Sequence, residues 1–284
     1  MTSESDGTPP PQAPGVRRSP RQRTRTEGRL KASDAVIAHI RNDIVSGRLA
    51  RQERLPSERD LAARFGVSQP TVRESLRALE AMNWVEVRHG SGVFVAGELS
   101  NRVGAMLTPM FQMERVGVLE VLEMREVLGL YSVRIAAQRA TTRDVDSVAT
   151  AMKQCDAASA TSEFAEAITA FQLSLSAAAH SPVVFSVESF LIRLLMQFQL
   201  LADRDASDRI WKERTDAFKV DRVRLLSELE QRHTEGLTLA MRRYLEHQRN
   251  WFTADAEISK LLLSDFEIRL ALDDIFVGLP QDPD

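Results

Sequence analysis

Residues 55–95, LPSERDLAARFGVSQPTVRESLRALEAMNWVEVRHGSGVFV, constrain the fold more than any other part of the chain. In the first half, Ser57 is a good helix N-cap and Gly66 is a stop signal. A second helix follows at once, with Ser68 as its N-cap and Pro70 near the first helical position. Its apolar residues recur on one face, at Val72, Leu76 and Leu79. We therefore predict two short helices joined by a tight turn.

The segments on either side complete a larger pattern. A helical run precedes the pair, with apolar residues at Val36, Ile37, Ile40, Ile44 and Val45. After Asn83 the period changes to two, with apolar residues on both sides of an HGSG turn, which predicts a β-hairpin. Helix, short helix, turn, helix and hairpin in this order are the layout of a winged helix-turn-helix.

The second helix of the pair has a polar face suited to nucleic acid. A helix that enters the major groove must bury one stripe and offer short polar or cationic side chains near its N-terminus. The residues of this type are Ser68, Gln69, Thr71, Arg73 and Arg77. The hairpin tip carries little bulk and fits the narrower minor groove. For any single residue, an ordinary solvated surface position is an equal alternative. The prediction of DNA binding therefore depends on the whole arrangement.

Composition indicates a folded chain with an uneven charge. The 284 residues are 43% hydrophobic and 27% charged, enough for one large or two ordinary domains with a sizeable core. Residues 1–97 hold 16 Lys and Arg against 11 Asp and Glu, whereas residues 98–284 hold 21 against 29. This asymmetry indicates a basic part that faces a polyanion, although charges that merely solvate the surface are an equal alternative.

Signals for disulfides, export or membrane insertion are missing from the sequence. There is one cysteine, Cys155, and no apolar segment follows the N-terminal charges. No apolar run reaches the ~18 residues that a membrane-spanning helix needs. We expect a cytoplasmic protein without a membrane partner.

Composition and periodicity divide the chain into a disordered basic, Pro-rich tail at 1–29, the winged helix-turn-helix at 30–97, a helical domain at 98–255 and an acidic extension at 256–284. Helical segments of the third part are expected at 100–112, 118–140, 142–158, 162–179, 182–203, 208–232 and 234–264. The expected fold class is mainly α, with an N-terminal winged helix-turn-helix that carries a small β-hairpin wing and a C-terminal all-α bundle of about six or seven helices.

Residues 55–95 closely resemble the DNA-binding domain of the GntR family of bacterial transcription regulators. The stretch LEMREVLGLYSVRIAAQRAT and the helical remainder are similar to the FadR subfamily, whose helical ligand-binding domain is called FCD. The resemblance covers roughly residues 33–250. It implies that operator DNA is contacted by Arg59, Ser68, Gln69, Arg73, His89 and Gly90. Gln69 departs from the arginine often found there, and Gln suits adenine where Arg suits guanine.

Many FCD domains hold a divalent metal through an Asp-x3-His pair and two later histidines, and the metal receives the carboxylate of a small organic acid. In this sequence those four positions fall at Ile168, Gln172, Arg222 and Tyr244, none of which is a strong metal ligand. His247, one turn from Tyr244, is the only plausible stand-in. We therefore expect no metal and no other cofactor.

The resemblance instead implies an effector cavity in which side chains meet the ligand directly. Arg125 matches an arginine that relatives often direct at an acidic ligand, and Arg222 adds a second guanidinium. Because a buried arginine requires an anionic partner or a hydrogen-bond network, the pair indicates a carboxylate or phosphate ligand. An internal salt bridge of Arg125 to Glu126 or Glu188 is the alternative. Apolar residues that line such a cavity or simply form core are Phe171, Leu175, Leu191, Leu195, Met196 and Phe198.

These features predict a ligand-responsive regulator that binds double-stranded operator DNA. We expect a repressor that binds an imperfect palindrome as a homodimer, through a helical domain that also binds a small organic-acid or acyl-type effector. One alternative is a constitutive DNA-binding protein with an inert helical domain. An enzyme fused to a DNA-binding domain is less favoured, because no nucleophile-base pair, HExxH, phosphate loop or paired-Cys pattern occurs.

Overall fold

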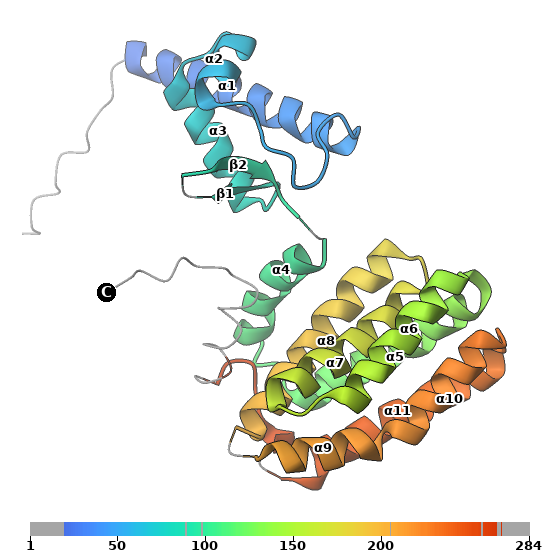
Figure 1. The fold of residues 1–284 in the computed structure, drawn as a ribbon. Helices are drawn as coiled ribbons and strands as arrows, with labels where there is room; N and C mark the ends of the chain where they lie inside the picture. The colour runs from blue at the N-terminus through green and yellow to red at the C-terminus, as the bar shows by residue number, and fades with distance from the viewer. Residues whose placement is uncertain are drawn as a thin grey trace, which may run out of the picture. The chain divides into compact units, whose positions relative to one another are not determined.

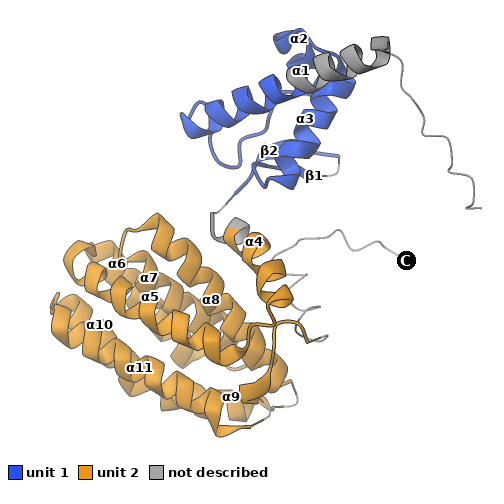
Figure 2. Ribbon diagram, turned by 180° about the vertical axis from the view of Figure 1, so that it is seen from behind, with its two compact units in different colours: residues 1–97 blue, residues 98–284 orange. Residues whose placement is uncertain are grey.

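The computed structural model describes residues 20–88, 90–97, 99–204, 206–256, 258–265 and 268. The chain divides into two units, residues 1–97 and 98–284, at the boundary that the change of pattern predicted (Figure 2). The start of the expected tail, most of the expected C-terminal extension and His89 lie outside the described residues.

The first unit is a winged helix-turn-helix, as predicted. Its elements are α1 (Pro20–Val45), α2 (Glu58–Phe65), α3 (Gln69–Ala81), β1 (Val85–Arg88) and β2 (Gly92–Val95) (Figure 1). The side chains of Ser57 and Ser68 cap α2 and α3, and Gly66 ends α2 with a φ of 63°. The strands pair antiparallel from Val85 opposite Val95 to Arg88 opposite Gly92.

Helix α1 begins at Pro20, and the side chains of residues 20–31, which include the last part of the expected tail, lie outside the described ones. Pro is favoured in the first turn of a helix, and Arg has a high helix propensity.

The core of the first unit is built from the predicted stripe. Val72, Leu76 and Leu79 of α3 are buried, and they pack with residues of α1, α2 and both strands. The other members of the core are Val36, Ile40, Leu55, Leu61, Ala62, Val85 and Val95. Burial of this stripe leaves the opposite face of α3 in solvent.

The described part of the second unit is all-helical, with eight α-helices where six or seven were expected. They are α4 (Leu99–Met113), α5 (Val118–Arg139), α6 (Thr142–Ala157), α7 (Thr161–Ala177), α8 (Pro182–Ala202), α9 (Asp208–Ala217), α10 (Lys219–Glu230) and α11 (Thr234–Ala254), followed by the 3-10 helix η1 (Ile258–Lys260). Helix α7 packs between α6 and α8, and α11 packs on α5 and α10 (Figure 1).

Two predicted helix boundaries are wrong. The segment expected as one helix at 208–232 is broken at Phe218 into α9 and α10. The Thr215 hydroxyl donates to the Trp211 carbonyl at 2.7 Å, a back-bond that bends helices, and Phe218 N bonds Thr215 O in a tighter turn. Helix α11 ends at Ala254 rather than 264, because the Asp255 carboxylate accepts from Ile258 N and starts η1.

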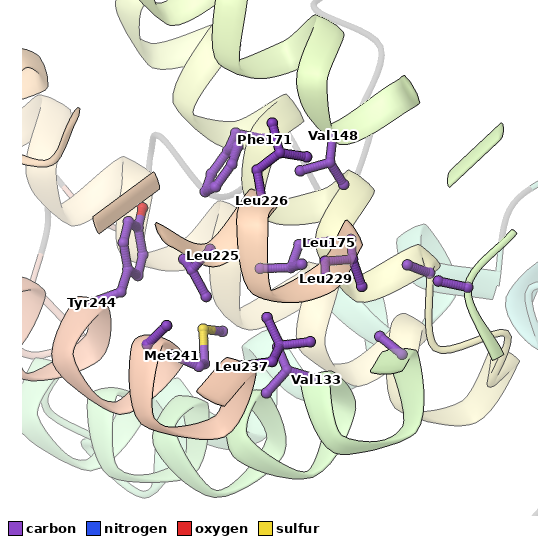
Figure 3. Close-up of a cluster of buried hydrophobic side chains, with 14 of the residues drawn as sticks. Val133, Val148, Phe171, Leu175, Leu225, Leu226, Leu229, Leu237, Met241 and Tyr244 are labelled. Atoms are coloured by element: carbon purple, nitrogen blue, oxygen red, sulfur yellow. The ribbon is translucent and has the colours of Figure 1, made fainter. Parts of the chain in front are cut away.

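The central core of the second unit joins α5, α6, α7, α10 and α11. Figure 3 shows Phe171 and Leu175 of α7 facing the leucines of α10, with Met241 and Tyr244 of α11 beside them. A second cluster surrounds the apolar residues of α8. Among the described residues, α8 is the one helix long and apolar enough to cross a membrane, and 56% of that stretch is buried inside the protein. Helix α8 is therefore a helix of the protein core.

Candidate DNA-binding surface and ligand cavity

The predicted recognition residues lie on the solvent face of α3 and at the start of α2. Ser68, Gln69, Arg73 and Arg77 are exposed, as is Arg59 of α2. Thr71 is the exception, because it is buried, with its Oγ1 atom 2.8 Å from Ser68 Oγ. A residue three positions after the N-cap turns toward the cap, so Thr71 stabilises the start of α3 and does not face solvent.

Arg73 is held by a carboxylate that we did not single out from the sequence. Its Nε lies 3.1 Å from Glu58 Oε1 and its Nη2 lies 2.7 Å from Glu58 Oε2. The hydrogen bond from Arg73 holds the pKa of Glu58 below its usual value, and the same bond raises the pKa of Arg73. Both side chains are therefore charged at neutral pH and joined across α2 and α3.

The hairpin tip has the geometry expected of a narrow wing. Gly90 is exposed and has a φ of 72°, a left-handed value that glycine adopts without strain. Ser91 N donates to Arg88 O at 2.9 Å and closes the turn. Arg88 lies over the Phe94 ring at 4.3 Å and forms an ion pair with Glu86 of the same strand, a contact that the motif did not reveal.

A cavity in the second unit brings together four of the five residues predicted to bind effector. Ile168, Gln172, Arg222 and Tyr244 all line it. The other lining residues are Gln199, Trp211, Arg214, Thr215, Phe218, Gln248, Trp251 and Phe252. The cavity has a volume of about 30 Å³, which holds one or two waters. In this conformation it accepts a small polar group, and a larger ligand requires the walls to move.

Arg222 is the central feature of the cavity. Its side chain is 1% exposed, and Nε and Nη2 have no hydrogen-bond partner among the described residues. These two nitrogens form one edge of the guanidinium and donate two parallel N–H bonds, the geometry that binds a carboxylate in a bidentate manner. A buried cation without a counter-ion is costly, and an anion at this edge would offset that cost.

Other polar groups of the cavity wall are also without partners. They are Gln172 Oε1 and Gln248 Oε1, both acceptors as assigned, and Trp211 Nε1, a donor. Burial raises the pKa of Tyr244 to about 12, so its hydroxyl is protonated at neutral pH. Gln248 and Trp211 were missed from the sequence, because only the fold brings α9 and α11 against α7.

Arg125 does not line the cavity. Its Nη1 lies 2.6 Å from Glu188 Oε1, both side chains are 1% exposed, and the Ser176 hydroxyl donates to Glu188 Oε2. The structure therefore places Arg125 in the internal salt bridge that the sequence left open as the alternative. The ion pair ties α5, α7 and α8 together in the core.

Gly129 makes room for the Arg125 guanidinium, which supplies a first prediction. A Cβ atom at Gly129 would overlap Arg125 Nη1 and lie 2.9 Å from Met241 Cε. Gly129→Ala should therefore destabilise the second unit by about 1–3 kcal/mol through overpacking, even though Ala gains up to about 1 kcal/mol of helix propensity. Urea unfolding followed by circular dichroism measures the change, and a net stabilisation would mean that the guanidinium is free to move.

The cavity wall does not fit a divalent metal. None of its lining residues is a carboxylate or an imidazole, and its oxygen donors are neutral amides and hydroxyls. His247 lies elsewhere, with its ring stacked 4.0 Å from that of Phe218 and its Nδ1 atom 3.1 Å from Asp221 Oδ2. Within the described part of the chain, no group of three His, Cys, Asp or Glu is placed to hold a metal.

Helix α9 forms one wall of the cavity and is held by side-chain contacts at both ends. Asp208 accepts from the backbone and the hydroxyl of Thr161, both at 2.8 Å. Arg214 forms an ion pair with Asp203 and lies 4.9 Å over the Trp251 ring. Since Trp211, Arg214 and Thr215 all come from α9, the position of this helix determines the size of the cavity.

Two models of protein families match the chain, one in each unit. Residues 32–95 match the model described as bacterial regulatory proteins, gntR family. Residues 120–247 match the model of the FCD domain. The first match spans the winged helix-turn-helix, and the second includes nine of the twelve residues that line the cavity.

Similar proteins are named as transcription regulators. The HTH-type transcriptional regulator LutR of Bacillus subtilis (strain 168) is 30% identical over 155 residues, which cover 54% of this chain and 71% of LutR. The HTH-type transcriptional repressor NanR of Enterobacter sp. (strain 638) is 32% identical over 139 residues, 46% of this chain and 52% of NanR. The solved structure of Streptococcus agalactiae GntR is 17% identical, with a TM-score of 0.57, over 77% of this chain and 99% of that one. This last likeness concerns the fold.

Proposed function

Because the chain belongs to the gntR family of bacterial regulatory proteins and is a DNA-binding transcription regulator, we propose that a small anionic ligand, bound by Arg222, controls its affinity for DNA. The observation that carries the proposal is the buried, unpartnered Nε–Nη2 edge of Arg222 in the cavity wall. A carboxylate supplies two oxygens at the spacing of this edge.

The remaining cavity groups favour a carboxylate with further polar atoms. Gln172, Gln248 and Trp211 present unpaired acceptors and a donor, which a ligand hydroxyl, carbonyl or bound water would satisfy. Leaving a buried polar group unpaired costs about 1–3 kcal/mol, so an occupant that pairs with these groups is favoured by its hydrogen bonds. Ligand binding thus stabilises one arrangement of α9 and its neighbours.

We propose that the anion is bound without a metal. The lining residues offer a guanidinium where a metal-dependent cavity would offer carboxylate and imidazole ligands. Native mass spectrometry combined with metal analysis tests this directly on the purified chain. The expected result is no stoichiometric metal, and one bound zinc or nickel ion per chain would contradict it.

The DNA-binding arrangement that we propose is a homodimer on an imperfect palindrome. Two recognition helices related by a two-fold axis require two half-sites at a fixed spacing. Effector binding would change the separation of the two α3 helices and release the DNA, which makes the protein a repressor, as the name of the similar NanR states for that protein. Its place of action is the cytoplasm, where the DNA is.

A second prediction concerns the recognition surface. Arg73→Ala should weaken specific duplex binding by about 1–3 kcal/mol, because it removes an exposed cation near the start of α3. The duplex is selected from a randomised library with the wild-type chain, and binding is followed by gel retardation at several salt concentrations. Arg143→Ala, which removes an exposed arginine from α6, is the control that should leave retardation unchanged.

Two alternatives make different predictions. A constitutive DNA-binding protein with an inert helical domain would show no thermal shift with any carboxylate, whereas an effector should raise the melting temperature and release the duplex. An enzyme fused to a DNA-binding domain would need a reactive constellation, and the relatives named here are regulators.

A further inference from the structure

The contact between Glu58 and Arg73 decides which edge of a recognition arginine is available to DNA. Arg73 uses its Nε and Nη2 atoms on the Glu58 carboxylate, at 3.1 and 2.7 Å. A guanidinium has five N–H donors arranged in two forks, one at Nε and Nη2 and one at Nη2 and Nη1. Glu58 therefore occupies the first fork completely and leaves the second.

The second fork remains open to solvent on the exposed face of α3. Arg73 is 57% exposed, and the structure describes no hydrogen-bond partner for its Nη1. The Nη2–Nη1 fork has the two parallel donors that bind O6 and N7 of a guanine in a bidentate manner. Because Glu58 fixes the other fork, the guanidinium plane is oriented before DNA arrives.

The charge of Glu58 discriminates between the two kinds of DNA partner. A phosphate that approached the guanidinium would bring a full negative charge close to the ionised carboxylate of Glu58. A guanine edge carries only partial charges, so it meets far less repulsion. Repulsion between the Glu58 carboxylate and a phosphate therefore favours contact of Arg73 with a guanine edge.

We propose that Glu58 is a positioning residue that commits Arg73 to reading a guanine edge in the major groove and turns it away from the phosphate backbone. The inference rests on the proposed role of Arg73 in DNA binding. It assigns to α2 a part in sequence discrimination, and it gives Arg73 a guanine edge as its partner in place of a phosphate.

The test compares wild type, Glu58→Gln and Asp60→Asn in fluorescence anisotropy titrations. The probes are the duplex selected by wild type from a randomised library and a scrambled duplex of the same composition. Asp60 is the matched control, because its carboxylate lies in the same helix turn but accepts from Ser57 at 2.6 Å instead of from Arg73. Both substitutions remove one negative charge.

In Glu58→Gln, the ratio of specific to non-specific affinity should fall about tenfold, because a bidentate base contact is lost. The plot of log affinity against log salt for the scrambled duplex should become steeper by about 0.9 per half-site, because the freed Arg73 neutralises a phosphate. Asp60→Asn removes the same charge from α2 but does not remove a partner of Arg73. It should therefore leave both the ratio and the slope close to those of wild type. In an Arg73→Ala background, Glu58→Gln should not change the ratio further.

An unchanged ratio in Glu58→Gln would overturn the inference while leaving specific DNA binding by wild type intact. The inference would also be overturned if Glu58→Gln weakened specific and non-specific binding equally and lowered the melting temperature, to the same extent with and without Arg73→Ala. Glu58 would then have only a structural role. A wild-type chain that does not prefer its selected duplex would contradict the proposed function itself.

Discussion

Glu188→Gln should lower the free energy of unfolding of the second unit by about 3–5 kcal/mol, because it leaves the buried Arg125 guanidinium without its counter-ion. The substitution keeps the shape of the side chain, so the loss reports on charge rather than on packing. It also weakens the hydrogen bond from Ser176, which now meets a neutral amide. No other variant of the ion pairs described here should be as destabilising.

Tryptophan fluorescence during urea unfolding measures this effect. Trp211 and Trp251 report on the second unit, and a Trp84→Phe background removes the signal of the first. Glu126→Gln is the matched control, because its partner Arg242 is 3.6 Å away and half exposed, and such a surface pair contributes about 0–1 kcal/mol. Equal losses in the two variants would mean that the Arg125–Glu188 pair is solvated.

Arg222→Met should have the opposite effect on stability and a large effect on ligand binding. Since Arg222 is a buried cation without a partner among the described residues, an apolar side chain there should leave the unfolding free energy unchanged or raise it by about 1–2 kcal/mol. Carboxylate binding should weaken at least about a hundredfold, because two charge-assisted hydrogen bonds together contribute about 3 kcal/mol or more.

Thermal melting of the dialysed chain and calorimetric titration of the carboxylate found by a thermal-shift screen measure the two effects. Arg224→Met is the control from the same helix, since Arg224 is exposed and lies 4.0 Å from Glu228. It should bind the carboxylate as wild type does. A loss of several kcal/mol in Arg222→Met would show that Arg222 has a structural role, and full binding would move the anion site elsewhere.

Local signals predicted the first unit well because its helix ends are decided by neighbouring residues. Ser57 and Ser68 cap helices through their own side chains, and Gly66 adopts the left-handed conformation that a helix stop requires. The hairpin follows from a change of period. In contrast, Thr71 looked like part of the polar face, and its burial depends on the orientation of the whole helix against α1 and α2.

The ligand cavity was predicted less completely, since its chemistry depends on residues far apart in the sequence. Arg125 and Arg222 looked equivalent as arginines on partly apolar helices. Only the fold places Glu188, 63 residues away, against Arg125 and leaves Arg222 without such a partner. The positions that the resemblance named, Ile168, Gln172, Arg222 and Tyr244, line the cavity, whereas Trp211 and Gln248 carried no signal in the sequence.

Control of DNA binding by an anion held on Arg222, without a metal, is the proposal on which the other predictions about the ligand depend. Its most direct test titrates a panel of small carboxylates into complexes of wild type or Arg222→Met with the selected, fluorescently labelled duplex, in the presence and absence of EDTA. At least one carboxylate should release the duplex from wild type, equally with and without EDTA, and should fail to release it from Arg222→Met. Release that disappears with EDTA, or that persists in Arg222→Met, would contradict the claim.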